Sequence, residues 1–216
     1  MYLDEQELFD LRRSLETIHG IVRFLKSDSE DEGDSPYPCL KELSKDIFTF
    51  PSLIQRINAI LSPYGKIKDN ASTELARIRR ELNNTMSSIS RSLNSILRNA
   101  QSEGVVDKDV TPTMRDGRLV IPVAPGLKRK IKGIVHDESA SGKTVFIEPA
   151  EVVEANNRIR ELEGEERREI IRILTEFSAL LRPDIPAVLE SYEFLGKIDF
   201  IRAKSLFAIQ ISGIKP

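Results

Sequence analysis

The sequence predicts a mainly helical fold that carries one small antiparallel β-sheet. Two long stretches repeat apolar residues at helical spacing, and a stretch rich in Pro, Gly and β-branched residues lies between them. The composition, rich in Ile, Leu, Arg and Glu and without Trp, also favours helices. This order predicts an antiparallel helical hairpin, with further helices at both ends of the chain, that holds a small sheet at its tip.

The first 66 residues predict three helices. Apolar residues with the spacing of one helix face open the chain: Leu8, Leu11, Leu15, Ile18, Val22 and Leu25. Asp4 and Glu7 have the spacing of an N-terminal capping pair for this helix. An acidic loop broken by Gly and Pro follows over residues 27–38. Two shorter helices are expected near Leu40–Ile47 and Leu53–Leu61.

The first arm of the hairpin is predicted over Asn70–Gly104, which contains no Pro and no Gly before its last residue. Its apolar seam repeats at three- and four-residue spacings: Leu75, Ile78, Leu82, Met86, Ile89, Leu93 and Ile96. At 1.5 Å per residue such a helix would reach roughly 50 Å. We therefore expect one long helix that buries this seam against a second one.

The second arm is predicted to begin at Pro149, a residue favoured in the first helical turn, and to end before Pro183. Its seam is Val152, Asn156, Ile159, Leu162, Ile170, Ile173, Phe177 and Leu180. The stretch Glu163–Glu169 is almost wholly charged, so we expect weak packing and a solvated helix face there. Another helical stripe follows over Ile185–Ile211.

Residues 105–149 predict the β-sheet. Asp116–Gly117 separates two β-branched runs and is a strong signal for a two-residue hairpin turn. Two more short strands are expected over Ile131–His136 and Thr144–Ile147, joined by a polar turn at Asp137–Lys143. So small a sheet is not stable alone and must pack on the arms.

One stretch resembles a nucleotide site, and the residues argue against it. Ser141–Thr144 reads like the end of a phosphate-binding P-loop, but the Gly that this motif needs five residues before Gly142 is replaced by Asp137. The loop is also expected to enter a strand, whereas a P-loop leads into a helix. We expect no nucleotide site here.

No catalytic or metal site is expected either. His136, Asp137 and Ser139 resemble a nucleophilic triad, but residues so close on one turn rarely converge, so a hydrogen-bonded turn is the better interpretation. Only His19 and His136 could serve as histidine ligands, and they lie far apart. The single Cys39 excludes an internal disulfide and fits a reducing cytoplasm. Apolar runs are too short to cross a membrane.

A basic cluster is the one candidate binding feature. The net charge is −4 over residues 1–66 and +4 over residues 67–150. The candidate nucleic-acid-binding residues are Lys128, Arg129, Lys130 and Lys132, together with Arg115 and Arg118 beside the hairpin turn. Exposed Lys and Arg suffice for sequence-independent phosphate contact, although ordinary surface charge is the alternative. No aromatic residues interleave with them, which argues against single-strand binding.

Two long motifs resemble the second bacterial branch of the MutS family. They are Met114–Val123 (MRDGRLVIPV) and Gly133–Pro149 (GIVHDESASGKTVFIEP). Three shorter stretches also match, in the family's order: Ala71–Arg79, Asn156–Leu162 and Ile198–Lys204. This branch lacks the mismatch-reading domain and is often described as suppressing recombination.

The resemblance implies a helical core over residues 1–66 and 183–216, an outgoing lever helix over 67–104, a β clamp over 105–149 and a returning lever helix over 150–182. It also implies an ATPase domain, with ATP and magnesium, and a nuclease-type domain beyond residue 216. The expected parent is a cytoplasmic homodimer, whose clamp binds duplex or branched DNA in recombination suppression or repair. For residues 1–216 themselves we expect no cofactor.

Two alternatives stay open. Members of the branch are also implicated in splitting ribosomes, so the clamp could grip a ribosome or its RNA through the same basic residues. A structural coiled-coil spacer would instead show no nucleic-acid affinity, even at low salt.

Overall fold

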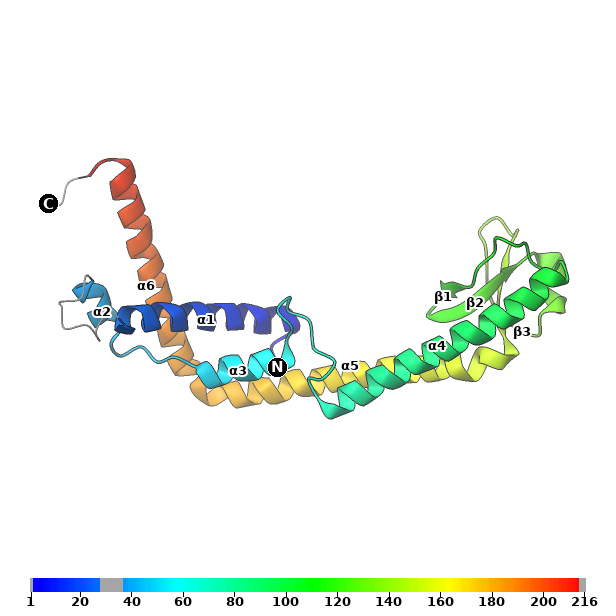
Figure 1. The fold of residues 1–216 in the computed structure, drawn as a ribbon, viewed down its shortest axis with the longest axis horizontal. Helices are drawn as coiled ribbons and strands as arrows, with labels where there is room; N and C mark the ends of the chain where they lie inside the picture. Colours follow the sequence, from blue (N-terminus) through cyan, green and yellow to red (C-terminus); the bar gives the residue numbers. More distant parts are fainter. Residues whose placement is uncertain (1, 28–36, 214–216) are drawn as a thin grey trace. The chain divides into compact units, whose positions relative to one another are not determined.

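A computed structural model describes residues 2–27 and 37–213 (Figure 1). The predicted acidic loop lies largely outside the described residues. The helices are α1 (Glu5–Ser27), α2 (Pro38–Ser44), α3 (Pro51–Ile60), α4 (Thr73–Ser102), α5 (Val153–Leu181) and α6 (Ile185–Gln210). The strands are β1 (Thr113–Arg115), β2 (Arg118–Val123), β3 (Gly133–Glu138) and β4 (Val145–Pro149). A mainly helical fold with a small antiparallel sheet is thus confirmed.

The chain forms two compact units. The first contains residues 1–71 and 171–216, and the second contains residues 72–170. Helix α5 contributes its residues 153–170 to the second unit and its last residues to the first. None of the described helices is both long and apolar enough to cross a membrane.

In the first unit, α1 begins with the predicted capping pair. The Asp4 backbone amide donates to Glu7 Oε2 at 2.9 Å, and the Glu7 amide donates to Asp4 Oδ1 at 2.8 Å. This reciprocal arrangement satisfies two amides that the helix itself leaves without partners. All six residues of the predicted stripe are buried. The later part of the stripe packs with Phe194 of α6, so the sequence identified this core correctly.

The two short helices of the first unit both begin at a proline. Pro38 and Pro51 occupy the first turn of α2 and α3, where a missing amide hydrogen costs nothing. The observed helices therefore start two residues before the predicted ranges. After α5, a 3-10 turn, η3 (Arg182–Asp184), leads directly into α6.

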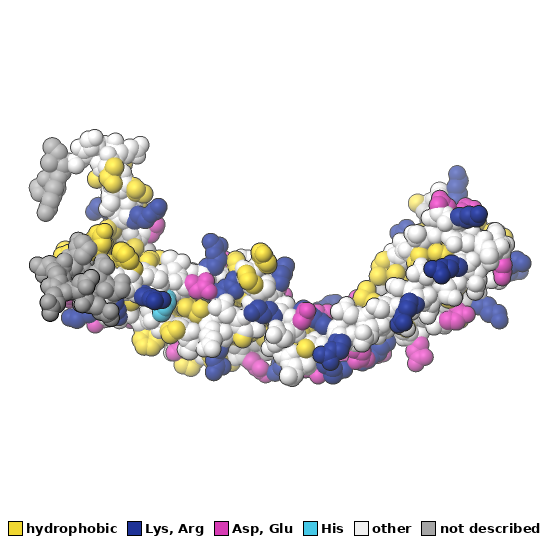
Figure 2. Space-filling view, viewed as in Figure 1, with side chains coloured by type: hydrophobic (Ala, Val, Ile, Leu, Met, Phe, Trp, Pro, Cys, Tyr) yellow, Lys and Arg dark blue, Asp and Glu magenta, His cyan; other side chains and the backbone are white. Residues whose placement is uncertain are grey.

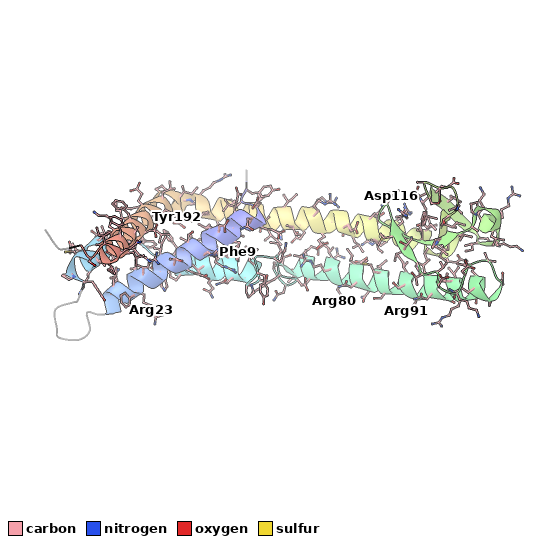
Figure 3. All side chains as sticks on the ribbon, turned by 90° about the horizontal axis from the view of Figure 1, so that it is seen from above. Phe9, Arg23, Arg80, Arg91, Asp116 and Tyr192 are labelled. Carbon is pink, nitrogen blue, oxygen red and sulfur yellow. The ribbon has the colours of Figure 1, made fainter. Side chains whose placement is uncertain are left out.

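In the second unit, α4 and the first part of α5 lie side by side (Figures 1 and 3). Ser72 caps α4, because its Oγ accepts a hydrogen bond from the Leu75 amide at 2.9 Å. The same hydroxyl donates to Glu169 of α5 at 2.6 Å. The predicted helical hairpin is therefore present. Ser72 both caps α4 and joins it to α5.

The sheet has the strand order β1-β2-β4-β3, and all its pairs are antiparallel. Asp116 and Gly117 have φ values of 46° and 73°, as a two-residue hairpin turn of the primed type requires. Several predicted boundaries in this unit were wrong. The strand predicted from Ile131 begins at Gly133, and the helix predicted from Pro149 begins at Val153, because β4 extends through Pro149 and a 3-10 turn follows.

The core of the second unit lies between the sheet and the two helices. It combines Ile89, Leu93, Leu97 and Ala100 of α4 with Ile121, Val123, Val145 and Ile147 of the sheet and with Val152 and Ile159 near the start of α5. Strand β4 lies between β2 and β3 and is buried along its whole length. The helices thus provide the packing surface that so small a sheet needs.

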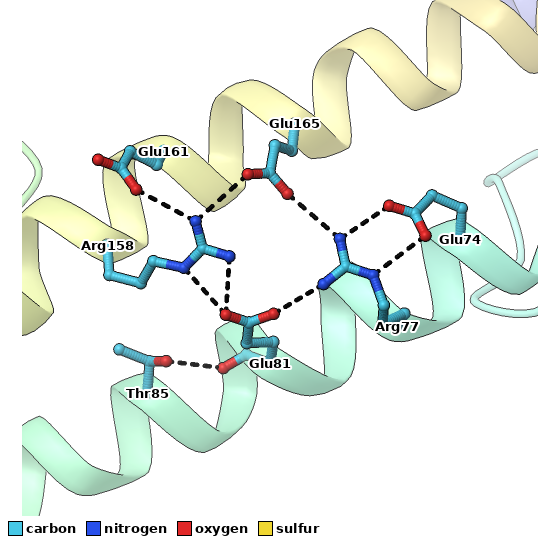
Figure 4. Close-up of polar contacts among 7 residues, drawn as sticks. All are labelled: Glu74, Arg77, Glu81, Thr85, Arg158, Glu161 and Glu165. Carbon is cyan, nitrogen blue, oxygen red and sulfur yellow. Dashed lines mark hydrogen bonds and ion pairs between the residues drawn. The ribbon is translucent and has the colours of Figure 1, made fainter.

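Charged residues also join the two helices, contrary to the solvated face predicted for Glu163–Glu169 (Figure 4). Arg77 of α4 pairs with Glu81 at 2.9 Å and with Glu165 of α5 at 3.4 Å. Arg158 of α5 pairs with Glu81 at 2.8 Å and with Glu165 at 3.3 Å. Two arginines and two shared glutamates therefore bridge α4 and α5.

Candidate nucleic-acid interface

The basic segment consists of Lys128, Arg129, Lys130 and Lys132, at the end of the 3-10 helix η1 (Pro125–Lys130) and just after it. Leu127 packs against the core of the second unit, and Ile131 is buried within it. These two apolar side chains anchor the segment to the core. All four basic side chains are consequently exposed to solvent.

The four cations have no partners among the described residues. None of their side chains makes a hydrogen bond or an ion pair within the described part of the chain. Figure 2 shows Lys and Arg side chains standing out from the surface of this unit, among some acidic ones. A ligand phosphate could therefore contact these ammonium and guanidinium groups without displacing a protein carboxylate.

The two arginines beside the hairpin turn are placed differently from the basic segment. Arg115 is exposed, and its guanidinium carbon lies 4.2 Å from the centre of the Phe146 ring. Arg118 donates to both oxygens of Glu148, at 2.7 and 3.0 Å, and to Asn157 Oδ1 at 2.7 Å. Its side chain is only 15% exposed. Arg118 therefore pairs with groups of the protein itself, whereas the Arg115 side chain remains accessible to a ligand.

Glu148 is the centre of a buried polar network that the sequence did not reveal. Its side chain is fully buried and accepts hydrogen bonds from Arg118, from Asn156 Nδ2 at 2.8 Å and from His136 Nε2. Burial acts to raise the pKa of this carboxyl, but the hydrogen bonds from Asn156, His136 and Arg118 outweigh it and hold the pKa below its ordinary value of 4.5. Glu148 is therefore a buried carboxylate whose charge is compensated.

This network fixes the sheet to the helix. Asn156 of α5 also exchanges hydrogen bonds with the Leu119 backbone of β2, at 3.3 and 3.4 Å. Arg160 of α5 donates to the carbonyl oxygen of Asp116, the hairpin residue labelled in Figure 3, at 2.6 Å. Strands β2, β3 and β4 are thus joined to the start of α5 through side chains. The signal in the sequence was a polar seam residue, Asn156, at a position that periodicity assigned to the core.

The P-loop-like stretch leads into β4, as predicted, and not into a helix. Gly142 has a φ of 67°, and the Thr144 amide donates to Ser139 Oγ at 3.0 Å, so this loop is a tight hydrogen-bonded turn. His136 contacts Glu148 in the interior, so it forms no triad with Asp137 and Ser139. Within residues 2–27 and 37–213 we find no group of three or more His, Cys, Asp or Glu residues that could hold a metal ion.

The chain is similar to proteins named Endonuclease MutS2. It is 39% identical over 215 residues to the protein of Finegoldia magna and 34% identical over 215 residues to that of Alkaliphilus oremlandii, which covers all of this chain and 27% of each relative. The protein of Clostridioides difficile is 39% identical over 189 residues, which covers 87% of the chain and 24% of that relative. The chain thus spans about a quarter of the length of these relatives. No family model matches it.

Proposed function

The chain belongs to the second branch of the MutS family, the branch without a mismatch-reading domain, and from this we propose that its second unit binds nucleic acid through the basic segment. The relatives are named endonucleases, and an endonuclease cleaves the backbone of a nucleic acid. The observation that carries the proposal is the set of four exposed cations without a partner among the described residues.

We assign the parts of the chain as follows. Residues 105–149 act as a clamp, residues 67–104 and 150–182 act as the two levers that carry it, and residues 1–66 and 183–216 contribute to a helical core. Contacts from Lys and Arg to phosphates are independent of base sequence, so the basic segment binds the backbone of duplex or branched DNA whatever its sequence. The ATPase activity, the nuclease activity and the dimeric state belong to the longer protein in this proposal.

The test replaces all four cations of the basic segment with Gln and measures affinity for a labelled mixed-sequence duplex between about 50 and 200 mM salt. Each phosphate contact that is lost lowers the slope of log affinity against log salt by about 0.9, so four contacts lower it by roughly three to four units. Affinity at low salt should fall as well.

The control must carry the same change in net charge. Arg23, Arg56, Lys66 and Lys197 are exposed cations of the first unit, and their replacement with Gln should leave the slope nearly unchanged. Equal slopes for the wild type and the basic-segment variant would refute the proposal. If ribosomes outcompete duplex DNA for binding to the wild type, the ligand of the basic segment is the ribosome and not DNA. Absence of any binding at low salt would favour a structural spacer.

A further inference from the structure

A groove lies in the second unit between the end of α4 and the basic segment. It has a volume of about 260 Å³ and is lined by Ile96, Asn99, Ala100, Glu103, Val105, Lys130, Ile131, Lys132 and Glu151. Small-molecule pockets commonly measure roughly 300–1,000 Å³. This groove therefore suits something smaller than a drug-sized ligand, such as one planar ring.

The floor of the groove is formed by the way α4 ends. Gly104 has a φ of 67°, and the Val105 amide donates to the Ala100 carbonyl at 2.8 Å, which turns the chain back under the last helical turn. Ala100, Val105 and Ile131 are all buried. The base of the groove is therefore apolar, is held by a backbone hydrogen bond, and lies beside Lys130 and Lys132.

The rim carries charges of both signs. Lys130, Lys132, Glu103 and Glu151 are exposed, and none of the four makes an ion pair with another described residue. The carboxylates lie beside the C-terminal end of α4, whose partial negative charge favours hydrogen-bond donors over anions. The lysines attract an anion. A matching ligand has a phosphate, a flat apolar ring and amino groups on the ring's edge.

We propose that this groove holds a single unpaired nucleotide of a branched or bulged DNA whose duplex lies on the basic segment. The base lies on the apolar floor, its phosphate contacts Lys130 and Lys132, and its amino group donates to Glu103 and Glu151. Carboxylates accept hydrogen bonds from the amino group of cytosine, whereas thymine has no amino group to donate. The groove therefore favours DNA with an unpaired cytosine over the intact duplex, and this step rests on the proposed function of the basic segment.

The test measures affinity for four labelled DNAs that share one duplex sequence. One is the intact duplex, and the other three carry a single extrahelical cytosine, thymine or abasic site. The cytosine bulge should bind tighter than the thymine bulge by roughly fivefold to 150-fold, the range for one specific base contact. The thymine and abasic bulges should stay close to the duplex.

Two variants examine the groove without touching the cations. Glu103→Ala combined with Glu151→Ala should remove the preference for cytosine over thymine, because no acceptor remains for the cytosine amino group. Asn99→Trp should do so by filling the groove from its exposed rim. Glu154→Ala, the matched change at an exposed position of α5 outside the groove, should keep the preference. The readout is the ratio of the two affinities, because removing carboxylates near cations raises binding of every DNA.

The outcomes separate the two proposals. A wild type that binds duplex DNA but shows no preference for cytosine over thymine overturns the groove assignment and leaves the basic segment intact. A preference that survives both groove variants overturns it as well. A wild type that binds none of the DNAs at low salt overturns the proposed function itself.

Discussion

Replacing Glu148 with Gln should destabilise the second unit by about 3 kcal/mol. The fully buried carboxylate accepts hydrogen bonds from Arg118, Asn156 and His136. A Gln amide keeps one acceptor and turns a donor group toward these donors. Breaking a buried ion pair costs about 3–5 kcal/mol, because the remaining charge is left uncompensated. Arg118 is 15% exposed and can recover some hydration, so the lower end of that range applies.

Amide hydrogen exchange followed by mass spectrometry is the suitable assay. The chain has no Trp, and its four Tyr residues all lie outside residues 72–170, so intrinsic fluorescence does not report on the second unit. Peptides from β2, β3 and β4 should exchange faster in the variant, with an opening free energy lower by about 3 kcal/mol. Glu154→Gln is the matched control and should stay within about 0.5 kcal/mol of the wild type.

The effect should also depend on pH. The folded pKa of Glu148 lies below 4.5, its ordinary value, so its contribution to stability is complete above 4.5 and is lost as pH falls through the folded pKa. The wild type should therefore lose more stability than the Gln variant as pH falls below 4.5. A variant with wild-type exchange rates, or with the same loss in acid, would refute the role assigned to this network.

Three further changes test other parts of the second unit. Glu81→Gln should weaken the ion pairs between α4 and α5. The rate of amide hydrogen exchange in these helices should therefore rise above that of the wild type at low salt and approach it at high salt, where ion pairs are screened. The exposed Glu163→Gln should have no effect. Gly133→Ala should lower the free energy of unfolding, measured by thermal denaturation, by about 3 kcal/mol, because the added Cβ would lie 2.1 Å from the Glu148 carbonyl oxygen. Gly126→Ala is the control and should have little effect, because a Cβ at Gly126 meets nothing within 4 Å. Ser72→Ala should cost about 1 kcal/mol in denaturant unfolding through the lost cap of α4, and no change would contradict the capping geometry.

Much of the fold could be predicted because local signals and packing agree. The stripe of α1, its Asp4–Glu7 cap, the long repeat of α4 and the Asp116–Gly117 turn are each set by neighbouring residues, and all are present. Boundaries near Pro149 were wrong because Pro suits both the end of a strand and the first turn of a helix. Propensity alone cannot choose between these two positions.

The polar interactions could not be predicted, since they join residues far apart in the chain. Glu148 and Arg118 are 30 residues apart, and Arg158 and Glu81 are 77 apart. Periodicity identifies which face of a helix is inward but not which charged residue on another element will face it. For the same reason Arg118 looked equivalent to Arg115 in the sequence, although only Arg115 is exposed.

The central claim is that nucleic acid lies on the basic segment of the clamp. Lysine acetylation footprinting of the wild type, with and without duplex DNA at low salt, tests it residue by residue. We predict that DNA protects Lys128, Lys130 and Lys132 from acetylation, while Lys66 and Lys197 of the first unit react equally in both conditions. Protection of Lys66 or Lys197 alone, with the three clamp lysines unchanged, would contradict the account.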